Sequence, residues 1–222
     1  MQIDMRVMEL LASKLCHDLV SPVSAINNGV ELIEEIGGTV VPEAMKLIGD
    51  SGATAAHRLR LYRIAYGRVG SDSSLAVKDV HQIAEQFLAS TKTSLIWPEG
   101  LPTDDLIQRR GFLKTLLNII VLAEETLAYG GAITLRDLKG GNGCSVEIVG
   151  RSAGLSLKLQ EALEAAVPID ELTPRSIQAY LTGRLAENFG FKLTHDHSIP
   201  DRLDLILTAP ILESEPVTVN VS

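Results

Sequence analysis

An apolar pattern near the start of the chain constrains the fold more than any other feature of the sequence. Apolar side chains recur there at helical spacing over about seven turns. They are Met8, Leu11, Leu15, Leu19, Val23, Ile26, Val30 and Ile33, which we call the apolar seam. Gly37 and Gly38 then interrupt the pattern, because glycine disfavours helix. The spacing therefore predicts one long amphipathic helix.

A second helical pattern starts after Val41 and Pro42 and continues to Tyr66. Its apolar positions include Ala44, Leu47, Ile48, Ala55, Leu59, Tyr62 and Ala65. The short connection between the two patterns predicts a helical hairpin. Two helices cover a seam of this length poorly, so we expect a second copy of the chain to complete a four-helix bundle. The N-terminal part is therefore predicted to form a homodimer.

The composition between Gly67 and Ser74 is typical of a linker. We therefore expect a helical hairpin at residues 1–70, a second domain at 75–212 and a flexible tail at 213–222. The patterns of the second domain predict helices at about 79–90, 105–128, 156–166 and 173–189, and strands at 92–97, 131–138, 144–150, 191–197 and 202–209. Helices interleaved with adjacent strand pairs indicate an α+β fold, with a C-terminal α/β sandwich.

Charge and composition exclude several function classes. The 222 residues include 20 basic and 28 acidic side chains, and this net charge of −8 makes nucleic acid a poor partner. Two cysteines are too few for a disulfide scaffold or a structural zinc site. Apolar stretches fall short of the roughly 18 residues of a membrane span, and the first residues do not resemble a signal peptide. We therefore expect a cytoplasmic protein that does not bind membranes.

One segment departs from this acidic character. Residues 51–70 contain Arg58, Arg60, Arg63 and Arg68 and no acidic residue. A basic stripe of this kind suits an acidic protein partner, which it attracts by charge. The alternative interpretation is a solvated helix face.

His17 is the strongest candidate for a reactive group. At about 100° per residue, it lies near 200° from Leu15 and thus away from the seam, on one polar ridge with Ser21, Ser24 and Asn28. An exposed imidazole with a pKa near 6.5 is largely neutral in the cytoplasm, and a ring nitrogen can act as a nucleophile. The adjacent Asp18 carboxylate can accept a hydrogen bond or a proton.

Pro22 adds a structural constraint one turn after His17. A proline inside a helix lacks an N–H, so it frees the carbonyl four residues earlier, here that of Asp18, and it bends the helix. The bend would give a bulky partner room at the imidazole. The alternative interpretation is an ordinary surface histidine beside a tolerated kink.

Other candidate groups carry weaker signals. His57 lies among the arginines of the second helix but lacks a neighbouring acid and a following proline. His195 and His197 face the same side of a predicted strand, although two histidines without a third ligand are weak grounds for a metal site. Cys16 is expected to be a packed small side chain rather than a nucleophile.

The segment His17 to Ile26 resembles the phosphoacceptor box of histidine kinase dimerisation domains. That box has the pattern His, acid, Leu, Arg, polar, Pro, Leu, Thr, Ala, Ile, and this chain reads His-Asp-Leu-Val-Ser-Pro-Val-Ser-Ala-Ile. Val20 replaces the usual arginine, which makes it an apolar contact candidate beside the histidine. The resemblance implies that an ATPase-like domain follows.

The N-box of such a domain is degenerate in this chain. The stretch Phe112 to Glu125 resembles the helix that carries it, and Asn118 matches the first asparagine. Leu122 stands in place of the Mg²⁺-binding asparagine, and Glu125 replaces the usual lysine. Without that amide oxygen, metal coordination fails.

Two further nucleotide motifs are also lost. Gly150 replaces the adenine-binding aspartate of the Asp-x-Gly-x-Gly motif, and Ser152 replaces its first glycine. The phosphate loop falls on residues 176–179, which include no glycine. The sequence therefore predicts a degenerate histidine kinase ATPase-like domain that binds no ATP and no metal.

Over essentially its whole length the chain resembles the ChpT-type histidine phosphotransferases. The resemblance implies a homodimer that accepts phosphate on His17 from the receiver domain of a hybrid histidine kinase. It then passes the phosphate to response regulators of the CtrA and CpdR types, which govern the cell cycle. The resemblance further implies that the receiver supplies the Mg²⁺ and that this two-component protein has no ATP-dependent kinase activity. The expected docking residues are Val20, Ser24, Asn28, Arg58, Arg60 and Arg63.

Two other function classes remain open. In a response-regulator phosphatase, Asp18 and Ser21 would orient a water molecule. A dimeric scaffold would carry out no chemistry. A stable label on His17 distinguishes transfer from both.

Overall fold

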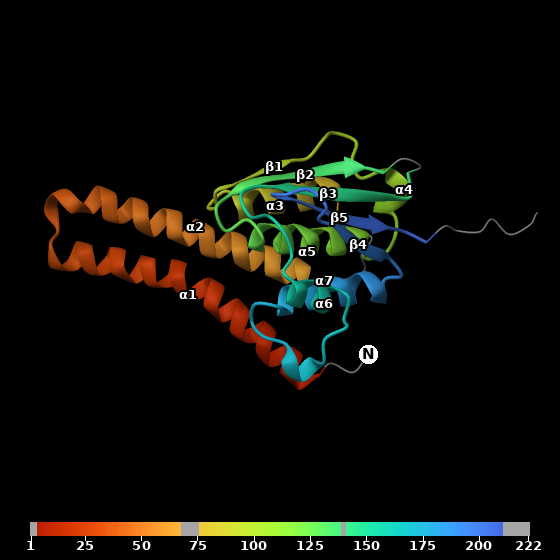
Figure 1. Cartoon of the computed structure of the whole chain (residues 1–222). Coiled ribbons are helices and arrows are strands. Elements are labelled where there is room, and N and C mark those ends of the chain that lie inside the picture. The colour runs from red at the N-terminus through yellow and green to blue at the C-terminus, as the bar shows by residue number, and fades with distance from the viewer. Residues whose placement is uncertain (1–3, 68–75, 139–140, 211–222) are drawn as a thin grey trace, which may run out of the picture.

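The computed structural model describes residues 4–67, 76–138 and 141–210 (Figure 1). Arg68, the predicted domain boundary near residue 70 and the predicted tail at 213–222 lie outside these ranges. Within them, no helix is long and apolar enough to cross a membrane.

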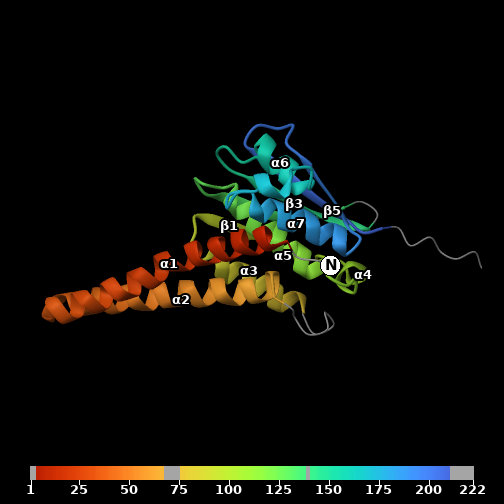
Figure 2. The same ribbon diagram turned by 90° about the horizontal axis from the view of Figure 1, so that it is seen from below.

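Two long antiparallel helices form the N-terminal hairpin, as the sequence predicts. Helix α1 spans Met5–Glu35, and α2 spans Val41–Ala65. The 3₁₀ turn η1, Gly38–Val40, joins them. Gly37, which precedes the turn, and Gly38, which begins it, both have positive φ. Figures 1 and 2 show the two helices side by side, projecting well beyond the rest of the chain.

The remaining residues form a five-stranded sheet with helices, which we call the α/β domain. Its strands are β1 (Thr93–Ile96), β2 (Gly131–Asp137), β3 (Gly143–Val149), β4 (Lys192–Asp196) and β5 (Arg202–Thr208). Their order is β1-β2-β3-β5-β4, with β1 parallel to β2 and every other pair antiparallel. Its helices are α3 (Val77–Leu88), α4 (Asp104–Ile107), α5 (Phe112–Glu125), α6 (Leu157–Leu163), η3 (Ile169–Glu171) and α7 (Ile177–Asn188).

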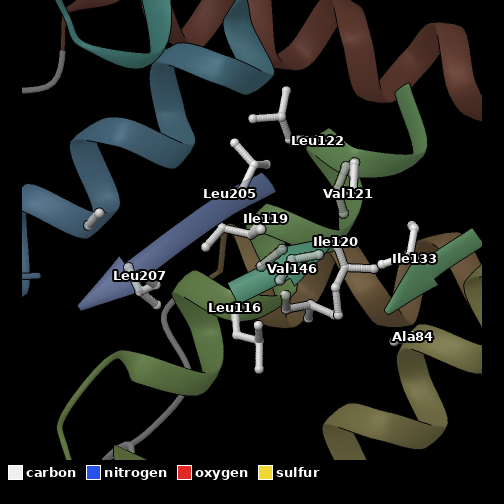
Figure 3. Close-up of a cluster of buried hydrophobic side chains, with 14 of the residues drawn as sticks. Ala84, Leu116, Ile119, Ile120, Val121, Leu122, Ile133, Val146, Leu205 and Leu207 are labelled. Atoms are coloured by element: carbon white, nitrogen blue, oxygen red, sulfur yellow. The ribbon is translucent and has the colours of Figure 1, made fainter. Parts of the chain in front are cut away.

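Helix α5 is the centre of the hydrophobic core. Helices α3, α5 and α7 lie along one side of the sheet (Figure 1). In Figure 3, apolar side chains of α5 meet Ile133, Val146 and Leu205 of the sheet. The α5 sequence is apolar almost all the way round, as expected for a helix buried on all sides. The α+β fold class predicted from the sequence is thus confirmed.

The predicted single helix at 105–128 is wrong, because the chain breaks it into α4 and α5. Gly111, at φ 80°, precedes α5 in the left-handed conformation. A Cβ on Gly111 would lie 2.2 Å from the ring of Phe189, so the packing of α5 beside α7 requires glycine there. The helix predicted from residue 173 also begins later, at Ile177.

Small side chains pack the outer part of the hairpin. The buried residues there are Pro22 and Gly29 on α1 and Ala44, Ser51 and Ala55 on α2. The larger residues Val23 and Val30 of the apolar seam remain exposed in the single chain. The seam is therefore only partly covered in the single chain, where Leu15, Leu19, Ile26 and Ile33 are half-buried.

The predicted seam is wrong at the start of α1. Met8 is 49% exposed, whereas Val7 and Leu10 are buried in the main core. The α/β domain packs against this end of the helix, where Arg6 Nη2 donates to the carbonyl of Leu172 at 3.1 Å. The buried face of α1 is therefore set by two different neighbours along its length.

We predict that Gly29→Val destabilises the hairpin by about 1–3 kcal/mol, a typical penalty for overpacking. A Cβ at this position would lie 2.7 Å from Ile48 Cγ1 and 3.2 Å from the carbonyl oxygen of Ala44. Urea unfolding measures the loss.

Gly49→Ala is the matched control, because a Cβ there meets nothing within 4 Å. It should stabilise α2 by about 0.5–1 kcal/mol through helix propensity. Equal effects of the two substitutions would contradict the close packing at Gly29.

Candidate functional site

His17 lies in the middle of α1 with its side chain 89% exposed. The other residues of the predicted ridge, Ser21, Ser24 and Asn28, are also exposed, and Val20 is 61% exposed. The outward orientation predicted from the helical wheel is confirmed. A nitrogen of this imidazole is thus accessible to a second protein.

Asp18 joins His17 to the second helix. Its Oδ1 lies 3.3 Å from His17 Nδ1. Its Oδ2 accepts a 2.6 Å hydrogen bond from the Tyr62 hydroxyl and forms an ion pair with Lys14 Nζ at 3.2 Å. Partial burial tends to raise the pKa of Asp18, but the Tyr62 hydrogen bond and the Lys14 charge outweigh it and hold that pKa below its usual range. Asp18 is therefore a carboxylate at neutral pH.

Lys14 links this carboxylate to the α/β domain. Its ammonium also forms an ion pair with Glu125, at the end of α5, and its side chain is only 11% exposed. Burial tends to lower the pKa of Lys14, yet Glu125 and Asp18 together raise it. Lys14 remains charged between two carboxylates from different parts of the fold.

The carbonyl that Pro22 frees has its own donor. Arg58 Nη1, from α2, donates to the Asp18 carbonyl oxygen. An unpaired carbonyl would be costly where the two helices pack, and the guanidinium replaces the missing N–H. Arg58 therefore stabilises the helix where Pro22 interrupts its hydrogen bonding, beside His17.

The predicted basic stripe is divided by the structure. Arg58 turns toward α1, whereas Arg60 Nη1 donates to Gln86 Oε1 of α3 at 3.3 Å. Arg63 is exposed. The interpretation of these residues as one continuous surface is wrong, because residues two apart face nearly opposite sides of a helix. Docking by Arg60 and Arg63 stays a prediction.

Sequence reasoning missed Lys14 and Tyr62 as partners of Asp18, and Glu125 as a partner of Lys14. Lys14 lies four residues before Asp18, a spacing that favours an ion pair on a helix. Tyr62 lies 44 residues from its partner Asp18. Glu125 lies 111 residues from its partner Lys14. No local sequence pattern indicates either contact.

Asn118 and Gln178 form a buried polar network with the end of α2. Asn118 Nδ2 donates to the Ala65 carbonyl at 3.0 Å, and Gln178 Nε2 donates to Asn118 Oδ1 at 3.3 Å. The Tyr66 hydroxyl donates to Gln178 Oε1. Both amides lie at positions that the kinase resemblance assigns to nucleotide motifs. In this structure, their side chains form hydrogen bonds with other residues of the chain instead.

The weaker candidates have structural roles or no assembled site. His195 Nε2 lies 3.2 Å from Glu164 Oε1, and His197 Nδ1 lies 2.9 Å from the Arg202 carbonyl. Over the residues that the structure describes, no group of three side chains suits a metal ion. His57 is half-buried. Cys16, expected to be packed, is exposed, because it lies beside His17 on the outer side of α1.

Comparisons with known proteins agree with this geometry. Residues 77–199 match the profile of the histidine phosphotransferase C-terminal domain family. The protein phosphotransferase ChpT of Brucella abortus (strain 2308) is 33% identical over 189 residues, which cover 83% of this chain and 87% of that protein. A solved structure of a bacterial phosphotransferase aligns with a TM-score of 0.74 and 27% identity, over 93% of this chain and 98% of the other.

We predict that Arg58→Met destabilises the chain by about 1–3 kcal/mol, because it leaves the Asp18 carbonyl without a donor. In a Pro22→Ala background, the new backbone N–H at position 22 can donate to that carbonyl in its place. The cost of Arg58→Met should therefore shrink there, which a double-mutant cycle in urea measures. An equal cost in both backgrounds would show that Arg58 does not replace the missing N–H.

Proposed function

Because the chain belongs to the ChpT-like histidine phosphotransferase family, we propose that it carries phosphate on His17 between the receiver domains of two other signalling proteins. The observation that carries the proposal is the exposed imidazole whose Nδ1 faces the Asp18 carboxylate. Exposure gives a receiver access to the ring, and the carboxylate orients it.

In the proposed transfer, His17 Nε2 attacks the phosphorus of an aspartyl phosphate on the first receiver. The N–P bond forms as the bond from phosphorus to the aspartyl oxygen breaks, and the aspartate leaves as a carboxylate. A second receiver aspartate then attacks the phosphohistidine and restores the free imidazole. Positioning and charge neutralisation provide most of the rate in such a reaction. We expect the Mg²⁺ and a lysine to come from the receiver.

We propose that the donor is the receiver domain of a hybrid histidine kinase and that the acceptors are response regulators of the CtrA and CpdR types. This part of the proposal is supported by the resemblance to ChpT, and under it the protein acts in a cytoplasmic phosphorelay that governs the cell cycle. Arg60 and Arg63 are charged groups suited to an acidic receiver. Val20 provides an apolar contact beside the imidazole.

We also propose that this protein does not use ATP. The Asn118 and Gln178 side chains are fully buried and hydrogen-bonded to each other and to the end of α2. A nucleotide would have to displace these contacts. Leu122, where a histidine kinase has its Mg²⁺-binding asparagine, offers no oxygen ligand.

A homodimer is the third part of the proposal. Val23 and Val30 of α1 and Met45 and Leu59 of α2 are large apolar residues left exposed on the hairpin. Burying such a surface against a second copy of the chain would complete a four-helix bundle. On the helical wheel His17 lies away from the seam, so both imidazoles of a dimer would remain accessible.

The test of transfer uses receiver domains carrying labelled aspartyl phosphate. Mixing them with the protein should leave stable label on the wild type and none on His17→Ala, because only the ring nitrogen accepts the phosphoryl group. His57→Ala, which removes the competing histidine, should label normally. Labelled ATP alone should give no phosphohistidine.

Release of inorganic phosphate without a labelled intermediate would instead support a phosphatase. Full labelling of His17→Ala would exclude His17 as the acceptor. Receiver binding without any chemistry would support a scaffold.

We predict that Val23→Glu combined with Val30→Glu converts the protein from a dimer to a monomer, because two buried charges per chain disfavour the bundle. Light scattering measures the mass. Leu157→Glu, a change at an exposed apolar residue of the α/β domain, should leave the dimer intact. A wild-type monomer would contradict the four-helix bundle.

A further inference from the structure

We propose that Lys14 and Glu125 are positioning residues for the phosphoacceptor. They hold the Asp18 carboxylate in the orientation that keeps His17 Nε2 unprotonated and ready to attack. The inference deepens the proposed function and rests on it. It also gives the α/β domain a part in the transfer that requires no nucleotide.

The two oxygens of Asp18 have separate partners. Tyr62, at 2.6 Å, and Lys14, at 3.2 Å, both contact Oδ2. Oδ1 faces His17 Nδ1 at 3.3 Å. Because the Oδ2 partners fix the rotation of the carboxylate, Oδ1 is kept available to accept a hydrogen bond from the imidazole.

Glu125 fixes the position of Lys14. A lysine ammonium on a long flexible side chain has many rotamers, and an exposed pair with Asp18 alone would add little. Here the ammonium is nearly enclosed and lies between Asp18 and Glu125. Glu125 ends α5, whose other side chains fill the core. The contact chain therefore runs from the buried helix α5 of the α/β domain through Lys14 and Asp18 to His17.

The chemistry of transfer explains why this orientation matters. A neutral imidazole carries its proton on one nitrogen, and the hydrogen bond made there decides which nitrogen is left as the nucleophile. Donation from Nδ1–H to Asp18 leaves the lone pair on Nε2. As the N–P bond forms, the ring gains positive charge, which the adjacent carboxylate stabilises. A carboxylate that rotates away provides neither effect.

The substitution at position 125 is consistent with such a change of role. In the kinase resemblance a lysine stands at this position. A carboxylate reverses the charge and suits an ammonium on α1 instead. The ammonium forms its ion pair and hydrogen bond with Glu125, the second of two adjacent acidic residues.

The decisive measurement is the tautomer of His17 in the full-length protein, read from ¹⁵N NMR of histidine-labelled samples at a pH of about 8, above the pKa near 6.5 of an imidazole in water. His17→Gln assigns the resonance among the five histidines. The wild type should populate the Nδ1–H form. Glu125→Gln and Lys14→Met should shift the population toward Nε2–H, the form preferred by a free imidazole in water.

The same variants should slow transfer from a labelled receiver about tenfold, in line with the loss of one charge-assisted contact. Lys14→Arg keeps the positive charge, so its Nδ1–H population and its transfer rate should both be closer to those of the wild type than in Lys14→Met. Glu187→Gln is the matched control, because it breaks an exposed ion pair with Arg184 on α7. It should change neither tautomer nor rate.

The outcomes separate this inference from the proposed function. Normal transfer with an unchanged tautomer in Glu125→Gln and Lys14→Met would overturn the positioning role and leave the phosphotransferase intact. Slower transfer with an unchanged tautomer would attribute the effect to receiver docking and would also overturn it. Failure of the wild type to accept phosphate from any receiver would overturn the proposed function, while the tautomer shift would still establish the contact chain.

Discussion

Asp18 connects the proline-interrupted turn of α1, the exposed imidazole and the second helix. Its carbonyl loses the usual helical donor because Pro22 has no N–H, and its carboxylate is partly enclosed by the hairpin. Unpaired polar groups in such a place would destabilise the fold. Arg58 satisfies the carbonyl, and Tyr62 and Lys14 satisfy one carboxylate oxygen. The polar groups around Pro22 are therefore paired, and an Asp18 oxygen is left facing the His17 ring.

Helix α5 links that site to the rest of the molecule. Its apolar side chains build the core beneath the sheet, and its polar residues hold the hairpin at two points. Asn118 binds the end of α2 through the Ala65 carbonyl, and Glu125 binds α1 through Lys14. Two positions that belong to a nucleotide site in the kinase resemblance thus contact the hairpin that carries His17. A domain of this shape can support phosphotransfer by holding the hairpin in place.

Features that depend on neighbouring residues were predictable from the sequence. Helical spacing indicated the hairpin, the wheel indicated an exposed His17, and Pro22 indicated a freed carbonyl at Asp18. The prediction of one helix at 105–128 failed at Gly111, because the close approach of Phe189 requires a backbone conformation that no periodic pattern encodes. The predicted basic stripe failed because Arg58 and Arg60 face different helices, α1 and α3.

The sequence by itself determined the secondary structure of the hairpin, the identity of the exposed histidine and its adjacent acid, because these follow from residue type and helical period. Only the tertiary structure decided which groups complete the site. Tyr62 and Glu125 reach Asp18 and Lys14 across 44 and 111 residues, respectively, and Arg58 reaches the freed carbonyl across 40. Such contacts depend on how α2 and α5 pack against α1, which local spacing does not specify.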